Sequence, residues 1–158
     1  MNMYKTILVP HGGTKAGDEA LRHAIHIAKI DSAKIILFHV VEEIPVPPSF
    51  ALSQSEREKL LTNIDSANKT IKESMEMNLN EKITECERSG IKAESYVVFG
   101  DAAEEILKIV MEKDADLVVM AKRRKLKGLK KLLNLGSVSR KIVEHVTCPV
   151  YLIDIGDI

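Results

Sequence analysis

Short apolar runs alternate along this chain with stretches of helical periodicity. The apolar runs are rich in Ile, Leu and Val and hold few polar residues, which is typical of strands buried on both faces of a parallel sheet. They cover residues 4–10, 33–41, 92–99, 116–121 and 149–155. Pro149 opens the last run, at a position where a missing backbone donor is tolerated. The pattern therefore predicts five strands.

The stretches between these runs repeat apolar residues at the spacing of one helical face. They lie at residues 14–30, at 53–90, from 101 onward and at 137–146. A capping-box pattern starts at Ser53 and again at Asp101, and Ser137 is the expected N-cap of the last helix. Poor helix formers at residues 78–80 predict a bend or break in the second helix. Three prolines make residues 42–52 a loop.

Strands that alternate with helices predict a parallel sheet covered on both faces. Because crossovers are right-handed, the topology is limited to doubly wound forms. Ligands bind such sheets beyond the carboxyl ends of the strands, where the strand order reverses. Three predicted loops lie there, at residues 10–14, 41–48 and 121–137.

Composition places the chain among ordinary globular proteins. With 158 residues, 45% hydrophobic and 29% charged, it is expected to form one domain over residues 1–158. The longest apolar run, residues 117–121, is too short to cross a bilayer. The apolar part of residues 1–10 is too short for a secretory signal, so a cytoplasmic location is expected. Cys86 and Cys148 fit no metal or disulfide spacing and are expected to be buried or inert.

Positive charge is concentrated in one segment although the net charge is zero. Seven of the ten residues at 122–131 are Lys or Arg, which leaves 16 basic against 23 acidic residues elsewhere. This segment is suited to a nucleotide phosphate, an RNA backbone or an acidic protein surface, or it is a solvated loop. Aromatic residues make up only 4% of the chain. Nucleic acid is therefore not an expected partner, because single strands usually need stacking platforms.

The loop after the first strand reads Pro10-His11-Gly12-Gly13-Thr14. Paired glycines before a helix allow close backbone approach to an anion at the helix N-terminus, or they form a simple turn. His11 is more readily interpreted as a solvated residue than as a catalytic base. His39 is expected to be a hydrogen-bonded core residue. His23 and His26 lack a third ligand, so no metal site is expected.

A second candidate site opens the last helix. Gly136-Ser137-Val138-Ser139 offers hydroxyl groups and free amides, which form either a phosphate cradle or a plain helix start. Asp114 and Asp116 bracket the start of the fourth strand, at the end opposite the expected site. We interpret both as structural residues.

Several segments together resemble the universal stress protein family over almost the whole chain. They are residues 4–10, 19–28, 33–41, 100–107, 115–120 and 136–143, the last leading to Cys148-Pro149-Val150. The resemblance implies a flavodoxin- or Rossmann-like three-layer α/β sandwich of the adenine nucleotide alpha hydrolase-like type, with a five-stranded, doubly wound parallel sheet. It also implies a homodimer and a regulatory role in the stress response. Members of the family divide into those that bind ATP and those that do not.

The sequence departs from the ATP-binding pattern of that family. Binders typically carry Gly-x-x-Gly, nine residues and then Gly-Ser or Gly-Thr, and an Asp in the first loop. Here Ala121 and Arg124 replace the two glycines, eleven residues separate Arg124 from Gly136, and Gly12 takes the position of the Asp. Each lost contact is worth about 1–3 kcal/mol. The departures predict weakened or absent binding of ATP or AMP with Mg.

The leading hypothesis is a dimeric binding or regulatory protein without turnover. The alternative is an ATP-binding member of the family with slow ATPase activity. An adenylating enzyme would need HxGH or SGGxDS, which the first loop lacks, and a polyanion-binding protein would use the basic segment. The candidate nucleotide- or phosphate-binding residues are Pro10, His11, Gly12, Gly13, Thr14, Val41, Met120, Ala121, Lys122, Arg124, Gly136, Ser137, Val138 and Ser139. The candidate dimer interface is the apolar last strand, with Val150, Tyr151, Leu152, Ile153, Asp154 and Ile155.

Overall fold

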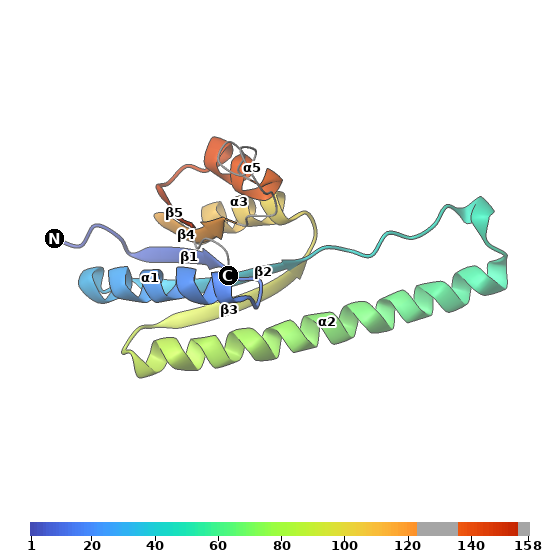
Figure 1. Ribbon diagram of the computed structural model, residues 1–158, viewed down its shortest axis with the longest axis horizontal. Helices are drawn as coiled ribbons and strands as arrows, with labels where there is room; N and C mark the ends of the chain where they lie inside the picture. Colours follow the sequence, from blue (N-terminus) through green and yellow to red (C-terminus); the bar gives the residue numbers. More distant parts are fainter. Residues whose placement is uncertain (123–135, 155–158) are drawn as a thin grey trace.

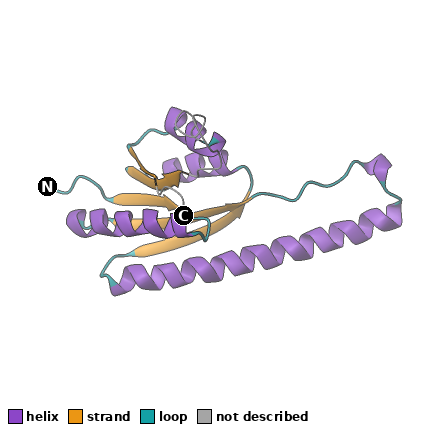
Figure 2. Ribbon diagram, viewed as in Figure 1, coloured by secondary structure: helices purple, strands orange, loops and turns teal. Residues whose placement is uncertain are grey.

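The computed structural model describes residues 1–122 and 136–154. Figures 1 and 2 show one sheet with helices on both of its faces. The elements are β1 (Thr6–Pro10), α1 (Lys15–Asp31), β2 (Lys34–Val41), η1 (Ser49–Ala51), α2 (Gln54–Arg88), β3 (Ala93–Phe99), α3 (Ala102–Glu112), β4 (Leu117–Lys122), α5 (Ser137–His145) and β5 (Val150–Asp154). All predicted strands are confirmed, with ends shifted by a few residues at most. Arg124, Ile155 and all of the basic segment except Lys122 lie outside the described residues.

The sheet has the order β3-β2-β1-β4-β5, and every neighbouring pair is parallel. β1 lies at the centre, between β2 and β4. The chain winds outward from β1 to β3, then crosses back to β4 and winds outward to β5. The strand order therefore reverses between β1 and β4, which makes their carboxyl ends the expected ligand site.

Two apolar layers hold the sheet. On one face, α1 and the second half of α2 pack on side chains such as Ile7, Val9 and Ile35. On the other face, α3 and α5 pack on Leu8 and Ile36. Alternate residues of the central strands thus enter different cores, and the near-continuous apolar runs of the sequence follow from burial on both faces.

Helix α2 does not bend where the sequence predicted. It runs unbroken over 35 residues and passes straight through Asn78 and Asn80. Leu79 between them is fully buried against the sheet. Burial of a leucine contributes about 1.5–3 kcal/mol, more than the unfavourable helix propensity of its two neighbours.

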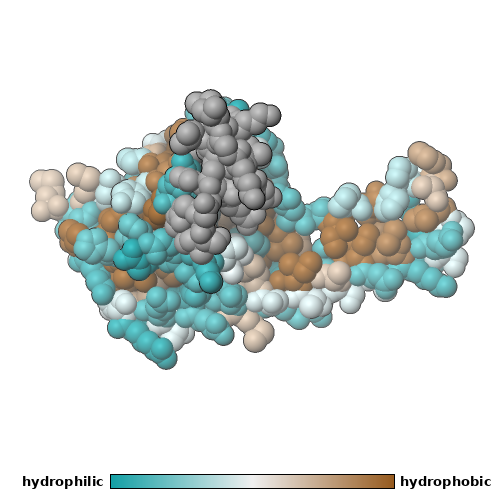
Figure 3. All heavy atoms as spheres, in the orientation of Figure 1, coloured by the Kyte–Doolittle hydropathy of each residue, from teal (hydrophilic) through white to brown (hydrophobic). Residues whose placement is uncertain are grey.

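The two halves of α2 have different surroundings. Leu79 and Cys86 are its buried residues, and both lie in the C-terminal half. The N-terminal half projects beyond the sheet together with the extended segment that follows β2, and we call these residues, 42–74, the arm (Figure 1). Apolar side chains gather along the arm in Figure 3, and its exposed members include Phe50 and Ile71.

Alanine substitutions in the two halves should differ in effect. Leu79→Ala removes a fully buried side chain and should lower the free energy of unfolding by about 2–5 kcal/mol. Ile71→Ala on the arm, where the side chain is 42% exposed, should cost about 0.5 kcal/mol or less. Urea denaturation of both variants measures the difference. Equal losses would show that the arm is packed as firmly as the core.

Candidate functional site

The first loop leaves the carboxyl end of β1 and enters α1 within four residues. Thr14 caps α1 and accepts a hydrogen bond from the Gly17 amide at 3.2 Å. Pro10, the last residue of β1, and Gly12 are half-buried, and Gly13 is exposed. The turn is therefore at the place where the switch in strand order predicts a ligand.

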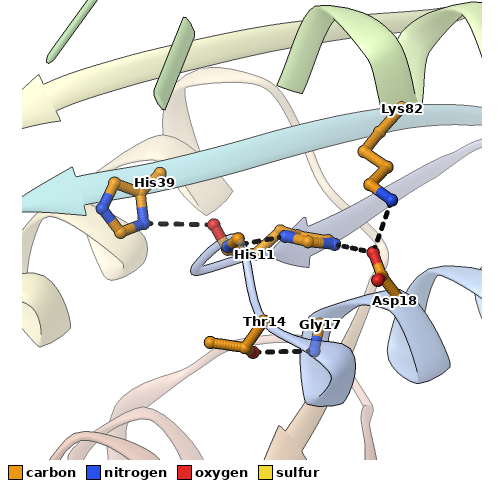
Figure 4. A network of polar contacts seen from close by, with 7 residues as sticks. His11, Thr14, Gly17, Asp18, His39 and Lys82 are labelled. Atoms are coloured by element: carbon orange, nitrogen blue, oxygen red, sulfur yellow. Dashed lines mark hydrogen bonds and ion pairs between the residues drawn. The ribbon is translucent and has the colours of Figure 1, made fainter. Parts of the chain in front are cut away.

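His11 is buried, contrary to the expectation of a solvated side chain. The residue is only 2% exposed. Its Nδ1 accepts a hydrogen bond from the Gly13 amide at 3.0 Å, and its Nε2 lies 3.0 Å from Asp18 Oδ1 (Figure 4). The room for the ring comes from Gly17 of α1, since a Cβ at Gly17 would lie 2.8 Å from His11 Nδ1.

The two partners of the ring define its protonation state. A backbone amide only donates, so Nδ1 must be the acceptor. The proton of the neutral ring therefore lies on Nε2 and is donated to the Asp18 carboxylate. Burial lowers the pKa of His11 below its usual value, although the nearby Asp18 carboxylate opposes this. With both nitrogens engaged, the ring is not placed to take a proton from a substrate.

Asp18 connects the first loop to α2. Lys82 Nζ of α2 lies 2.8 Å from the same carboxylate oxygen that His11 contacts. Partial burial alone would raise the pKa of Asp18, but donation by Lys82 and His11 outweighs it and lowers that pKa. Asp18 in turn raises the pKa of Lys82. One carboxylate thus ties together residues from the loop, α1 and α2.

Strand β2 holds the backbone of His11 at two points. Its amide donates to the Phe38 carbonyl of β2 at 2.9 Å. Its carbonyl accepts from His39 Nδ1, also on β2, at 3.1 Å. His39 is therefore hydrogen-bonded as predicted, although it is half-buried rather than fully in the core.

Gly13 adopts a conformation that favours glycine. Its φ is +71°, in the left-handed region. A Cβ there would lie 3.3 Å from Met75 Cε and 3.7 Å from Asn78 Oδ1 of α2. Side chains from α2 thus border the turn at Gly13.

The second candidate segment begins α5. Gly136, not Ser137 as predicted, is the N-cap, because the Arg140 amide donates to the Gly136 carbonyl and helical geometry starts at Ser137. No side chain caps this helix. Its first amides, those of Ser137, Val138 and Ser139, consequently have no acceptor within the helix. Since α5 returns the chain from β4 toward β5, this first turn lies on the carboxyl side of the sheet.

The remaining candidates line the ends of β2, β4 and β5. Val41 and Met120 are buried at 5% exposure each, and Ala121 is half-buried. Lys122 Nζ lies 3.4 Å from Asp154 Oδ2 on the neighbouring strand β5. The proposed part of Lys122 in an anion site remains a prediction.

Two further groups of residues have structural positions. The Asp116 carboxylate accepts from the amides of Lys5 and Thr6 at 2.8 and 3.1 Å, at the amino end of the sheet, as interpreted from the sequence. Cys86 is buried and Cys148 is half-buried, and burial raises the pKa of both thiols.

Across residues 1–122 and 136–154, no helix is long and apolar enough to cross a membrane, and no cluster of side chains is suited to a metal ion.

Burial of His11 makes stability depend on pH. The folded state favours the neutral ring, whereas the unfolded chain takes up a proton near the ordinary pKa of 6.5. The contribution of the neutral His11 ring to the free energy of unfolding is therefore fully present above about pH 6.5. This contribution is lost as the pH falls below that value. Urea denaturation between pH 7.5 and 5 should show this loss in the wild type and a smaller one in His11→Gln. The control His26→Gln, at an exposed position of α1, should lose as much stability over this pH range as the wild type. If the free energy of unfolding of His11→Gln falls with pH as steeply as that of the wild type, the prediction is wrong.

Comparison with known proteins supports the same interpretation of the fold. The model of the Universal stress protein family matches residues 3–154. Universal stress protein MJ0531 of Methanocaldococcus jannaschii is 32% identical over 152 residues, covering 96% of this chain and 83% of that protein. Universal stress protein YxiE of Bacillus subtilis is 33% identical over 152 residues, covering 96% and 99%.

Solved structures share the architecture at lower identity. The structure of the hypothetical protein MJ0577 superposes with a TM-score of 0.77 at 23% identity and covers 99% of both chains. A universal stress protein in complex with cAMP has a TM-score of 0.62 at 18% identity, covering 97% and 98%. An Arabidopsis thaliana family member with AMP bound has a TM-score of 0.58 at 18% identity, covering 96% and 92%. By its sequence match over nearly its whole length, the chain belongs to the universal stress protein family.

Proposed function

We propose that this protein is a regulatory binding protein that takes an adenine nucleotide weakly at the carboxyl ends of β1 and β4. The observation that carries the proposal is the pair of segments at that edge, the Gly12–Gly13 turn and the uncapped first turn of α5. Three uncapped amides and the positive end of the helix dipole suit a phosphate. The cAMP and AMP complexes of proteins with the same fold support the ligand class.

Weak affinity follows from what the site lacks. Gly12 supplies no carboxylate to the ribose hydroxyls. The side chain of Ala121 stands where a glycine would let the backbone approach a phosphate, and Arg124 replaces the second glycine. Each lost hydrogen bond reduces affinity by about tenfold or more.

Binding without turnover is supported by the chemistry of the described residues. Hydrolysis needs a group that activates water. His11, the titratable side chain nearest the turn, has both ring nitrogens engaged and is buried. The slow ATPase alternative has no observation in its favour and is separated from simple binding by a phosphate-release assay.

We further propose a homodimer paired along β5. Within residues 1–122 and 136–154, this strand is at one edge of the sheet and pairs with β4 alone. Tyr151 on this strand is 45% exposed, and its ring centroid lies 5.7 Å from that of His23 of α1, with the two rings tilted by 36°. Apolar edge strands tend to be paired or covered, and antiparallel pairing about a two-fold axis would cover this one.

Calorimetry with Mg-ATP and with AMP tests the ligand site. Wild-type protein should bind with a dissociation constant well above micromolar, and no phosphate should be released from ATP. Gly12→Asp should tighten binding by about tenfold, because a carboxylate accepts from the ribose, whereas the control Gly12→Ala should not. Submicromolar binding of Mg-ATP by the wild type would contradict weak binding, and equal affinities of the two variants would contradict the assigned role of position 12.

Sedimentation at micromolar concentration tests the dimer. The wild type should sediment as a dimer, and Leu152→Pro should shift it to monomer by removing a backbone donor. Because a proline can also unfold the strand, Tyr151→Glu at the exposed position serves as the second variant, since it places like charges together across a two-fold axis. A monomeric wild type, or a Tyr151→Glu variant that is folded and fully dimeric, would contradict pairing along β5.

A further inference from the structure

The first turn at the site presents one peptide group in a defined direction. The Gly13 amide points inward and donates to His11 Nδ1 at 3.0 Å (Figure 4). In a planar trans peptide, the carbonyl of the preceding residue points opposite to that amide. The Gly12 carbonyl therefore points away from the His11 ring, and no described residue donates a backbone hydrogen bond to it.

The His11 ring is itself held so firmly that it can impose this direction. Asp18 accepts from Nε2 at 3.0 Å, and Phe38 and His39 of β2 bond its backbone. The side chain of His11 has no exposed surface, and the ring packs directly against the backbone of Gly17, where a Cβ would lie 2.8 Å from Nδ1. A neutral ring with its proton on Nε2 offers only an acceptor to the turn.

Without that acceptor, the Gly12–Gly13 peptide would be free to choose its direction. Glycines adopt positive and negative φ almost equally, so a peptide between two of them flips at little cost. A flipped peptide would present an amide, which suits an anion. The peptide as found presents a carbonyl, which repels an anion and accepts from a hydroxyl or amine.

We propose that His11 is a positioning residue that keeps the Gly12 carbonyl outward, so that the first turn accepts a ligand hydroxyl of the ribose class and does not cradle a phosphate. The inference rests on the proposed nucleotide site and names the group that this turn recognises there. In a chain with glycine at position 12, the backbone carbonyl is the acceptor that the turn still offers to a sugar. The phosphate of the nucleotide is bound instead by the uncapped first turn of α5.

Two substitutions separate the contacts of the ring. In His11→Asn, the side-chain oxygen takes the place of Nδ1 and keeps an acceptor for the Gly13 amide, while the contact with Asp18 is lost. In His11→Gln, the side-chain amide reaches Asp18, while the acceptor beside Gly13 is lost. Both variants leave an imperfectly filled site, so their melting temperatures should fall by similar amounts, and a difference between them in binding is not a stability effect.

The probes are adenosine and 2′,3′-dideoxyadenosine, with AMP as the phosphate-bearing control. Wild type and His11→Asn should bind adenosine about threefold to tenfold more tightly than the dideoxy compound, as expected for one neutral hydrogen bond. His11→Gln should lose this preference. The affinity for AMP should exceed the affinity for adenosine by a similar factor in all three proteins. Equal preference for the hydroxyls in His11→Asn and His11→Gln would overturn the proposal.

Amide hydrogen exchange tests the positioning without a ligand. The Gly13 amide should exchange about tenfold faster in His11→Gln than in the wild type and at a near wild-type rate in His11→Asn. If the wild type binds neither adenosine nor AMP, the proposed nucleotide site is wrong, while this exchange pattern would still uphold the role of His11 in the turn. Equal exchange of Gly13 in all three proteins would contradict that role.

Discussion

The buried, neutral ring of His11 fixes the backbone at the carboxyl end of β1, where the first turn and the start of α1 lie. The His11 ring lies between the end of β1 and the first turns of α1, where it has no exposed side-chain surface. A buried nitrogen without a partner costs about 1–3 kcal/mol, so both ring nitrogens must be bonded. Asp18 and the Gly13 amide meet that requirement, and in doing so they fix the start of α1 and the direction of the turn. The candidate site is thus shaped from beneath by a side chain that has no exposed surface of its own.

The fold was largely predictable because burial on both faces leaves a strong pattern. Near-continuous apolar runs such as residues 33–41, bounded by polar segments, are typical of strands in the interior of a parallel sheet. The uninterrupted α2 was not predicted, because the poor propensity of residues 78–80 is a local property whereas the burial of Leu79 is a tertiary one. The N-cap of α5, Gly136, differed from the predicted cap by one residue, within the usual uncertainty of helix ends.

The candidate loops were predicted, but their internal chemistry was not. His11, Asp18 and Lys82 come from a loop and two helices, and no short motif joins them. One signal was present in the sequence. Gly17 lies inside a helix, where glycine costs about 1 kcal/mol relative to alanine, and such a residue usually marks a close contact. In this protein the contact is the His11 ring.

Helix α2 combines two sources of stability. Its C-terminal half is held by the core and supplies Lys82, while Met75 and Asn78 border the turn at Gly13. The arm depends on local interactions, including the capping box at Ser53 and the 3.9 Å pair Lys69–Glu73. Such pairs contribute about 0.3–0.5 kcal/mol each. The part of the helix that borders the site is therefore the part that the core holds rigid.

Nitrogen-15 NMR of the His11 ring tests the central claim most directly. The account predicts a neutral ring at pH 7 with its proton on Nε2, and a ring that takes up its second proton in the folded protein only below the ordinary pKa of 6.5. A proton on Nδ1 at pH 7, or titration of His11 in the folded protein at its ordinary pKa of 6.5, would contradict the account.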